Sequence, residues 1–312
     1  MTTFDFQQQL LSMSFDNLME IKVQDQENEY ISEIQDARWY KTAKQFYDNK
    51  YGIDPNRIVC GVILSIDKTH TDSKGKLCLE PVDFSLSLFK KDVRRKKKSA
   101  WRTLGFINDL NGNYLEDIWS ENEYFTQITG QNSIQRSVKK SIIYHQILDL
   151  IFESLREVQD IGIVWDLPMS SGLNSKSQCF RMVFPLCFGI YDMKGGKQLC
   201  AMYDANNVNR PCISCYCSLT DLVNSNKICE QVKEGDLKGK IMMSSTTVSS
   251  VNLKEISQYP NPVNAFFKLS HGGWPHGIWG LCPTEVLHQF YEGIVSYALE
   301  EFLDSVIKGS SI

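Results

Sequence analysis

The apolar run from Ile58 to Ile66 is the feature that most constrains how this chain folds. Seven of its nine residues are apolar, several of them are β-branched, and the run ends at the acid Asp67. Such a run is typical of a central strand that is buried on both faces. We therefore predict a strand over residues 57–67 that carries a carboxylate at its end. A simpler alternative is that Asp67 only caps or starts the polar turn that follows, because aspartate favours turns.

A second apolar run repeats this arrangement later in the chain. Residues 179–191 form the most apolar predicted strand after the first, and Asp192 follows it directly. Between the two runs we predict strands at 77–89 and 103–107 and a long amphipathic helix over 133–160. Two or three strands with a tight turn after the first indicate an antiparallel meander. The expected fold class is therefore α/β, with a mixed sheet flanked by helices.

Length and composition limit the number of domains that the chain can form and the classes of function that it can have. We predict a lead-in segment over residues 1–56 and one main domain over 57–308, with an irregular insertion at about 205–275. No apolar run reaches the roughly 18 residues of a membrane span, and the first residues lack the order of a signal peptide. The net charge of −4 gives no general affinity for nucleic acid, so any such contact must come from local basic patches.

A third acid position is predicted on the last helix, which opens at Pro283 and Thr284 and runs to about Lys308. Glu285, His288 and Glu292 share one stripe of this helix. Two strand-end acids followed by a helix acid have the spacing of a two-metal nuclease, in which carboxylates hold ions about 3.5–4 Å apart. The stripe also suits the solvent side of a helix, and a helix N-terminus by itself favours Glu285.

A basic segment separates the second and third predicted strands. Seven of its nine residues are positively charged, namely Lys90, Lys91, Arg94, Arg95, Lys96, Lys97 and Lys98. Such a run is explained by a solvated loop. It is also explained by a surface patch that binds DNA phosphates, or by a signal for nuclear import. The meander leads us to expect this segment near the Asp67 end of the sheet, which favours the DNA-binding interpretation.

The cysteines divide into two kinds. Cys60, Cys187 and Cys200 fall inside apolar runs, as small buried residues do, whereas Cys212, Cys215 and Cys217 cluster in a polar stretch. The spacing of Cys212 and Cys215 suits two ligands of one zinc ion. The remaining ligands could be two histidines among His271, His276 and His288, or the thiols of Cys217 or Cys229, and free structural cysteines are a further alternative.

Three stretches together resemble the catalytic blocks of Plavaka and CACTA (Tnp2-like) transposases. The first is Val62–Thr69 with the later Arg94–Trp101, and the second runs from Phe184–Pro185 through Asp192 and Lys197 to Pro211–Cys215. The third is His276–Gly280 followed by Pro283–Gln289, where an acid-x-x-His motif opens a helix. The three blocks span residues 58–308 in the order that the family has them.

This resemblance implies an RNase H-like catalytic domain over 57–308 that cleaves and joins DNA strands with two Mg²⁺ or Mn²⁺ ions. The implied catalytic and metal-binding acids are Asp67, Asp192 and Glu285, with Glu292 as the alternative third acid. Related cut-and-paste enzymes, including the V(D)J recombinase, hold a structural zinc ion with a CxxC pair and a distal histidine pair. Carried onto this chain, the Zn²⁺ ligands are Cys212, Cys215, His276 and His288. The implied partners are transposon ends and target DNA, in the nucleus, and transposases usually act as multimers, so a homo-oligomer is expected.

The chain also departs from the family pattern. Glu285 stands where aspartate is commoner, and the N-terminal DNA-binding zinc finger of the family is absent, so a partial copy is expected. Two alternatives to an active transposase follow. One is a catalytically inactive or domesticated DNA-binding protein, and the other is an unrelated α/β scaffold whose acids only cap turns.

Overall fold

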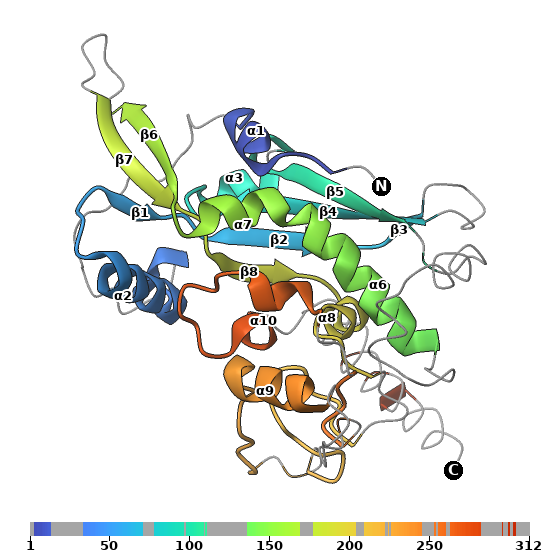
Figure 1. Ribbon diagram of the computed structural model, residues 1–312. Helices are drawn as coiled ribbons and strands as arrows, with labels where there is room; N and C mark the ends of the chain where they lie inside the picture. Colours follow the sequence, from blue (N-terminus) through green and yellow to red (C-terminus); the bar gives the residue numbers. More distant parts are fainter. Residues whose placement is uncertain are drawn as a thin grey trace.

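The protein is described by a computed structural model in which two mixed sheets are flanked by helices (Figure 1). The structure describes residues 3–13, 34–70, 78–96, 98–108, 110, 136–168, 177–203, 209–221, 224, 226–244, 253, 255–259, 263–281, 295, 299 and 302–303. Its strands are β1 (Arg57–Val59), β2 (Val62–Ile66), β3 (Thr69–His70), β4 (Cys78–Leu86), β5 (Arg102–Asn108), β6 (Ile163–Pro168), β7 (Ser177–Val183) and β8 (Leu186–Ile190). Its helices are α1 (Phe6–Leu11), α2 (Arg38–Tyr51), α3 (Lys91–Lys96), α6 (Arg136–Ile151), α7 (Glu153–Gln159), α8 (Met193–Leu199), α9 (Glu234–Ser244) and α10 (Gly277–Gly280), with 3-10 turns η2 (Ile34–Asp36), η3 (Lys98–Ala100) and η5 (Ala265–Lys268).

The apolar run at 58–66 is buried, but it forms two strands, β1 and β2, instead of the single strand predicted. The chain bends at Gly61, where a Cβ atom would lie 2.8 Å from the Cβ of Cys187 and 2.9 Å from the ring of Trp39. The run at 179–191 is broken in the same way at Phe184 and Pro185, which separates β7 from β8. Proline has no N–H to donate to a ladder, so a break at Pro185 is expected on chemical grounds.

The main sheet, which consists of β2, β3, β4, β5 and β8, places β2 at its centre. β2 pairs antiparallel with β4 along one edge and parallel with β8 along the other, and β4 in turn pairs antiparallel with β5. The meander predicted from the first three strands is therefore present as β2, β4 and β5. Because β8 runs parallel to β2, the carboxyl ends of these two strands lie at the same edge of the sheet.

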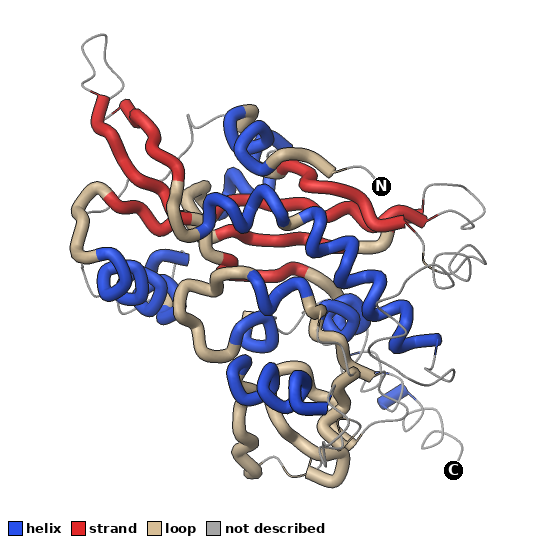
Figure 2. The backbone as a smooth tube through the Cα atoms, viewed as in Figure 1, coloured by secondary structure: helices blue, strands red, loops and turns tan. Residues whose placement is uncertain are grey.

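The second sheet has the strand order β1–β7–β6 and continues from the main sheet (Figure 2). Backbone hydrogen bonds of 2.8 Å from Cys60 N to Val183 O and from Val62 N to Pro185 O join the two at the bend. The β6–β7 hairpin extends away from the rest of the molecule (Figure 1). The two sheets are therefore linked where β1 leads into β2 and where β7 leads into β8.

One hydrophobic core includes both sheets and the segments before them. α6 and α7 cross one face of the main sheet (Figure 1), and Tyr144 and Leu148 of α6 belong to the core. Phe6 of α1 and Tyr47 of α2 are fully buried in the same core. The segment 1–56, predicted as a lead-in, thus contributes two helices to the packing of the main domain.

The predicted helix over 133–160 is interrupted at Phe152, so α6 and α7 are separate elements. The described residues of the predicted insertion at about 205–275 include α9 and η5. Most of the predicted last helix, including its acids, lies outside the described residues. None of the described helices is long and apolar enough to cross a membrane.

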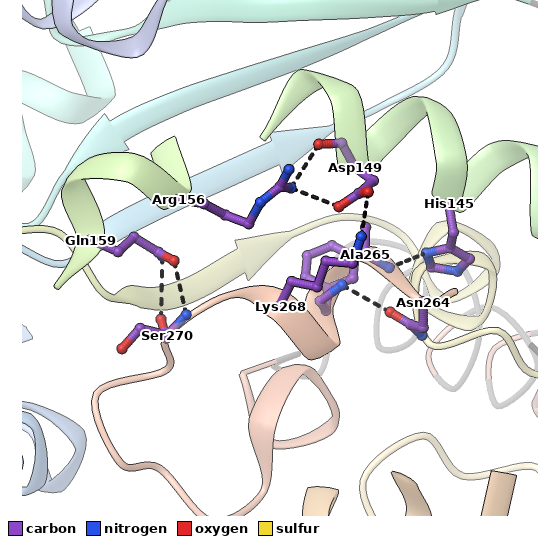
Figure 3. Close-up of polar contacts among 9 residues, drawn as sticks. His145, Asp149, Arg156, Gln159, Asn264, Ala265, Lys268 and Ser270 are labelled. Atoms are coloured by element: carbon purple, nitrogen blue, oxygen red, sulfur yellow. Dashed lines mark hydrogen bonds and ion pairs between the residues drawn. The ribbon is translucent and has the colours of Figure 1, made fainter. Parts of the chain in front are cut away.

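Polar contacts tie the insertion to α6 and α7 (Figure 3). Gln159 is buried, and its amide donates to the carbonyl oxygen of Phe184 at 3.2 Å and accepts from the N–H of Ser270 at 2.9 Å. Asp149 accepts from Arg156 at 2.7 Å and from Lys268 at 2.6 Å. These contacts hold residues 264–270 against the helices that cover the sheet.

Candidate active site

The strand register brings Asp67 and Asp192 side by side. Ser65 of β2 aligns with Ile190 of β8 in the parallel ladder. This is the last pair of the ladder, and Asp67 and Asp192 each follow it by two residues at the carboxyl edge of the main sheet. Neighbouring strands lie about 4.8 Å apart, so two acids that are separated by more than a hundred residues in sequence are neighbours in space.

Asp192 is positioned by the helix that follows it. It is the N-cap of α8, and its Oδ1 accepts a hydrogen bond of 2.5 Å from the N–H of Gly195. An N-cap aspartate satisfies one of the free N–H groups in the first turn of a helix. The capping role considered for the strand-end acids is therefore real for Asp192. It occupies one carboxylate oxygen and leaves the other without a described partner.

Both acids line a cavity of about 480 Å³, which we call the strand-end cavity. Its charged lining residues are the acids Asp67, Glu80 and Asp192 and the lysines Lys68, Lys140, Lys194 and Lys197. The walls come from the ends of β2, β4 and β5, from α6 and from α8. Carboxylates suit divalent cations and lysines suit phosphate oxygens, so the lining offers donors for both.

Glu80 of β4 is a cavity acid that the sequence analysis missed. Its carboxylate accepts a hydrogen bond of 2.7 Å from the hydroxyl of Tyr144, which also lines the cavity. Burial raises the pKa of Glu80 above its ordinary value, and the Tyr144 hydrogen bond opposes that rise. The charges of Asp67 and Asp192 add to the rise, because they disfavour another anion nearby. The three carboxylates therefore interact electrostatically.

The basic segment lies at the other end of the main sheet, so its expected position near Asp67 was wrong. Leu86 at the end of β4 aligns with Val62 at the start of β2, and the segment begins four residues after Leu86. The error arises because the loop that follows the second strand of a meander returns to the end where the first strand began.

The described basic side chains also differ in role. Lys90, Lys91 and Arg95 are exposed, whereas Arg94 is half-buried and donates to the carbonyl oxygens of Phe89 and Ser87, the latter at 3.3 Å. Lys97 and the side chains of Lys96 and Lys98 lie outside what the structure describes. Arg94 therefore stabilises the backbone of the segment that follows β4.

The third predicted acid cannot be placed, because Glu285 and its alternative Glu292 lie outside the described residues. Within the described part of the chain, no group of three or more His, Cys, Asp or Glu side chains is arranged to hold a metal ion. Asp67, Asp192 and Glu80 thus share one cavity without forming a closed set of ligands by themselves.

Four thiols interact in the stretch of the predicted zinc site, although in the described chain they are not arranged to hold a metal ion. An isolated bridge pairs Cys215 with Gln231, and Tyr216 N donates to Glu230 O at 2.8 Å, so Cys217 comes opposite Cys229. Burial and a hydrogen bond with Cys212 raise the pKa of Cys215 to about 11. A hydrogen bond with Cys229 is the main cause that raises the pKa of Cys217. Cys217 and Cys229 therefore lie with the CxxC pair.

The histidines predicted to complete that site are less favourably placed. His276 makes a hydrogen bond of 2.6 Å between its Nδ1 and the carbonyl oxygen of Val232, and its ring contacts Trp274. His271 is buried and lies 3.5 Å from a carboxylate oxygen of Glu234. His288 lies outside the described residues.

Fold and site together define a mixed α/β protein in which two strand-end aspartates and a third carboxylate face one cavity. The model of the Plavaka transposase family matches residues 4–300, nearly the whole chain. The chain therefore belongs to the Plavaka transposase family, which confirms the resemblance found in its motifs. No curated protein and no solved structure matches the chain.

Proposed function

We propose that this chain is the catalytic domain of a DNA transposase that cleaves and joins phosphodiester bonds with two divalent metal ions. The observation that carries the proposal is that Asp67 and Asp192 follow two adjacent parallel strands and line one cavity. Membership of a transposase family supplies the substrate class, which is the ends of a transposable element and the target DNA. A DNA substrate in turn suggests the nucleus as the place of action.

The strand order supports an RNase H-like assignment of the catalytic domain. β5, β4 and β2 form an antiparallel meander, and β8 is added parallel to β2 after the α6–α7 crossover. This order puts the first strand of the meander beside β8, which follows the helices after the β6–β7 hairpin. The arrangement suits two-metal chemistry, because it brings carboxylates from distant parts of the chain to one edge.

The residues present fit Mg²⁺ or Mn²⁺, since carboxylate oxygens are the ligands that these ions prefer. Asp67 and Asp192 would hold the ions together with Glu285, or with Glu292 in its place. When bound, such a pair of ions activates the attacking water or 3′-hydroxyl and stabilises the leaving oxygen. The role of the N-cap contact at Asp192 is to fix the direction of that carboxylate before the substrate binds.

The test is nicking of supercoiled plasmid by the purified chain in Mg²⁺ or Mn²⁺. Asp67→Asn, Asp192→Asn and Glu285→Gln should each abolish nicking. Glu157→Gln is the matched control, because Glu157 is an exposed acid of α7 outside the cavity. Full activity in any of the three variants removes that residue from the active site.

Binding and nicking assays on the same purified chain distinguish an active transposase from a domesticated DNA-binding protein. A protein that binds duplex DNA with a steep salt dependence, but does not nick it in either metal, is a binding protein. Sedimentation of the DNA complex should show more than one chain per duplex if the transposase acts as a homo-oligomer. A complex with a single chain would contradict that expectation.

We also propose a structural zinc ion at Cys212 and Cys215, completed either by His276 and His288 or by Cys217 and Cys229. The purified protein should contain about one zinc ion per chain, and the double variant Cys212→Ser/Cys215→Ser should contain none. The control is Cys179→Ser, since Cys179 is an exposed free cysteine. Loss of zinc in Cys217→Ser/Cys229→Ser, but not in His276→Ala, would identify the four-thiol site. Absence of zinc from protein prepared without chelator would refute the proposal.

A further inference from the structure

Lys197 is a buried lysine that lines the strand-end cavity. Only 6% of its surface is exposed, although lysine side chains are seldom buried to this degree unless they are paired. It lies in α8, the helix that Asp192 caps. The same short helix therefore has one of the proposed metal ligands, Asp192, as its N-cap and Lys197 as its fifth residue. Both residues line the same cavity.

The ammonium group of Lys197 has no partner within the described part of the chain. The backbone carbonyl of Lys197 accepts a hydrogen bond of 2.8 Å from Met202, but its side chain makes no hydrogen bond or ion pair to another described residue. By comparison, the exposed Lys50 and Lys268 pair with Asp160 and Asp149 at 2.9 and 2.6 Å. The nitrogen of Lys197 is not among the fully buried polar atoms that lack a partner. The buried stem therefore carries the ammonium to the surface of the cavity, where an anion can reach it.

We propose that Lys197 binds a phosphate group of the DNA substrate inside the strand-end cavity, beside Asp67 and Asp192. This inference rests on the proposed function, which makes a phosphodiester the anion that enters the cavity. A lysine ammonium is a compact charge with three donors, which suits a phosphate oxygen. Lys194 lies on the exposed part of the same helix and lines the same cavity, so it extends the positive surface toward solvent.

The experiment compares the full chain with Lys197→Met, which keeps the length of the side chain and removes its charge. Binding of a fluorescent 30-base-pair duplex of arbitrary sequence is measured at several KCl concentrations in Ca²⁺, to avoid turnover. Lys41→Met is the matched control, because Lys41 is exposed on α2 and does not line the cavity. Urea unfolding without DNA is measured for all three proteins, and plasmid nicking in Mn²⁺ for all three as well.

We expect Lys197→Met to weaken DNA binding, to reduce the slope of log Kd against log[KCl] by about 0.9, as for one lost phosphate contact, and to abolish nicking. Its resistance to urea should match that of the wild type, because methionine keeps the buried stem and the ammonium bonds to no described group of the fold. Lys41→Met should match the wild type in all three assays.

The possible failures are distinguishable. If Lys197→Met binds DNA with the affinity and salt slope of the wild type, Lys197 does not bind a phosphate. If Lys197→Met unfolds at clearly lower urea, the ammonium is part of the fold and the inference is overturned. If the salt slope differs between the wild type and Lys197→Met as expected, but the wild type never nicks DNA in Mn²⁺, the phosphate contact stands and the catalytic proposal fails. A wild type that neither binds nor nicks DNA overturns both.

Discussion

His145 should make the stability of this protein fall as the pH falls below 6.5. The side chain is fully buried on α6, where its Nδ1 accepts from the N–H of Ala265 at 3.4 Å (Figure 3) and its ring contacts Phe266. Burial lowers the pKa of His145 from 6.5 to about 3, because the charged form cannot be hydrated there. The histidine is therefore neutral in the folded protein above about pH 3 and charged in the unfolded chain below about pH 6.5.

The sign follows from proton linkage. Between pH 6.5 and 3 the unfolded state binds a proton at His145 that the folded state does not bind, so acid favours unfolding. The contribution is complete above pH 6.5 and is lost progressively as the pH falls. At 1.36 kcal/mol per pH unit, lowering the pH from 8 to 5 should reduce the free energy of unfolding by about 2 kcal/mol through this group alone.

The assay is urea unfolding of the wild type and of His145→Gln at pH 8, 6.5 and 5. Glutamine keeps an acceptor for Ala265 N–H and does not titrate. The other histidines and the carboxylates, including Glu80 with its raised pKa, are common to both proteins and cancel in the difference. The wild type should lose about 2 kcal/mol more than the variant between pH 8 and 5. Parallel pH profiles for the two proteins would refute the reasoning.

Three further predictions concern single contacts. Tyr144→Phe removes the donor to Glu80, so Mn²⁺ affinity measured by calorimetry should fall by about tenfold, as for lost outer-shell contacts at metal sites. Gln159→Leu leaves buried backbone groups of Phe184 and Ser270 without partners and should lower the free energy of unfolding by about 2–4 kcal/mol in urea. Arg94→Gln should lower the thermal midpoint without changing the salt slope of DNA binding, because Arg94 bonds backbone carbonyls.

Each of these has an outcome that contradicts it. Unchanged Mn²⁺ affinity in Tyr144→Phe would mean that Glu80 is remote from the bound ions. A change below about 0.5 kcal/mol in Gln159→Leu would mean that water satisfies the exposed backbone groups. A smaller salt slope with an unchanged thermal midpoint in Arg94→Gln would show that this arginine contacts DNA phosphates, as the sequence first suggested.

Local patterns in the sequence were sufficient to locate the main strands. Apolar runs and alternation identified the strands that contain Ile58–Ile66 and Val82–Leu86, because burial on one or both faces imposes a period that can be read over a few residues. The motifs also identified the family, which matches residues 4–300. The break at Pro185 was missed although proline itself marks it in the sequence. The break at Gly61 was missed because it depends on the side chains of Cys187 and Trp39, which lie against the glycine from elsewhere in the chain.

Two apolar runs that end on acids, at Asp67 and Asp192, and a CxxC pair before the last helix can be recognised in the amino-acid sequence alone. Folding is needed to show that β2 and β8 are parallel neighbours, that Glu80 and Lys197 line the same cavity, and that Cys217 and Cys229 interact with the CxxC pair. Strand formation can be recognised locally because it follows from short-range periodicity. Register and cavity composition instead depend on pairing between segments more than a hundred residues apart, which no local pattern encodes.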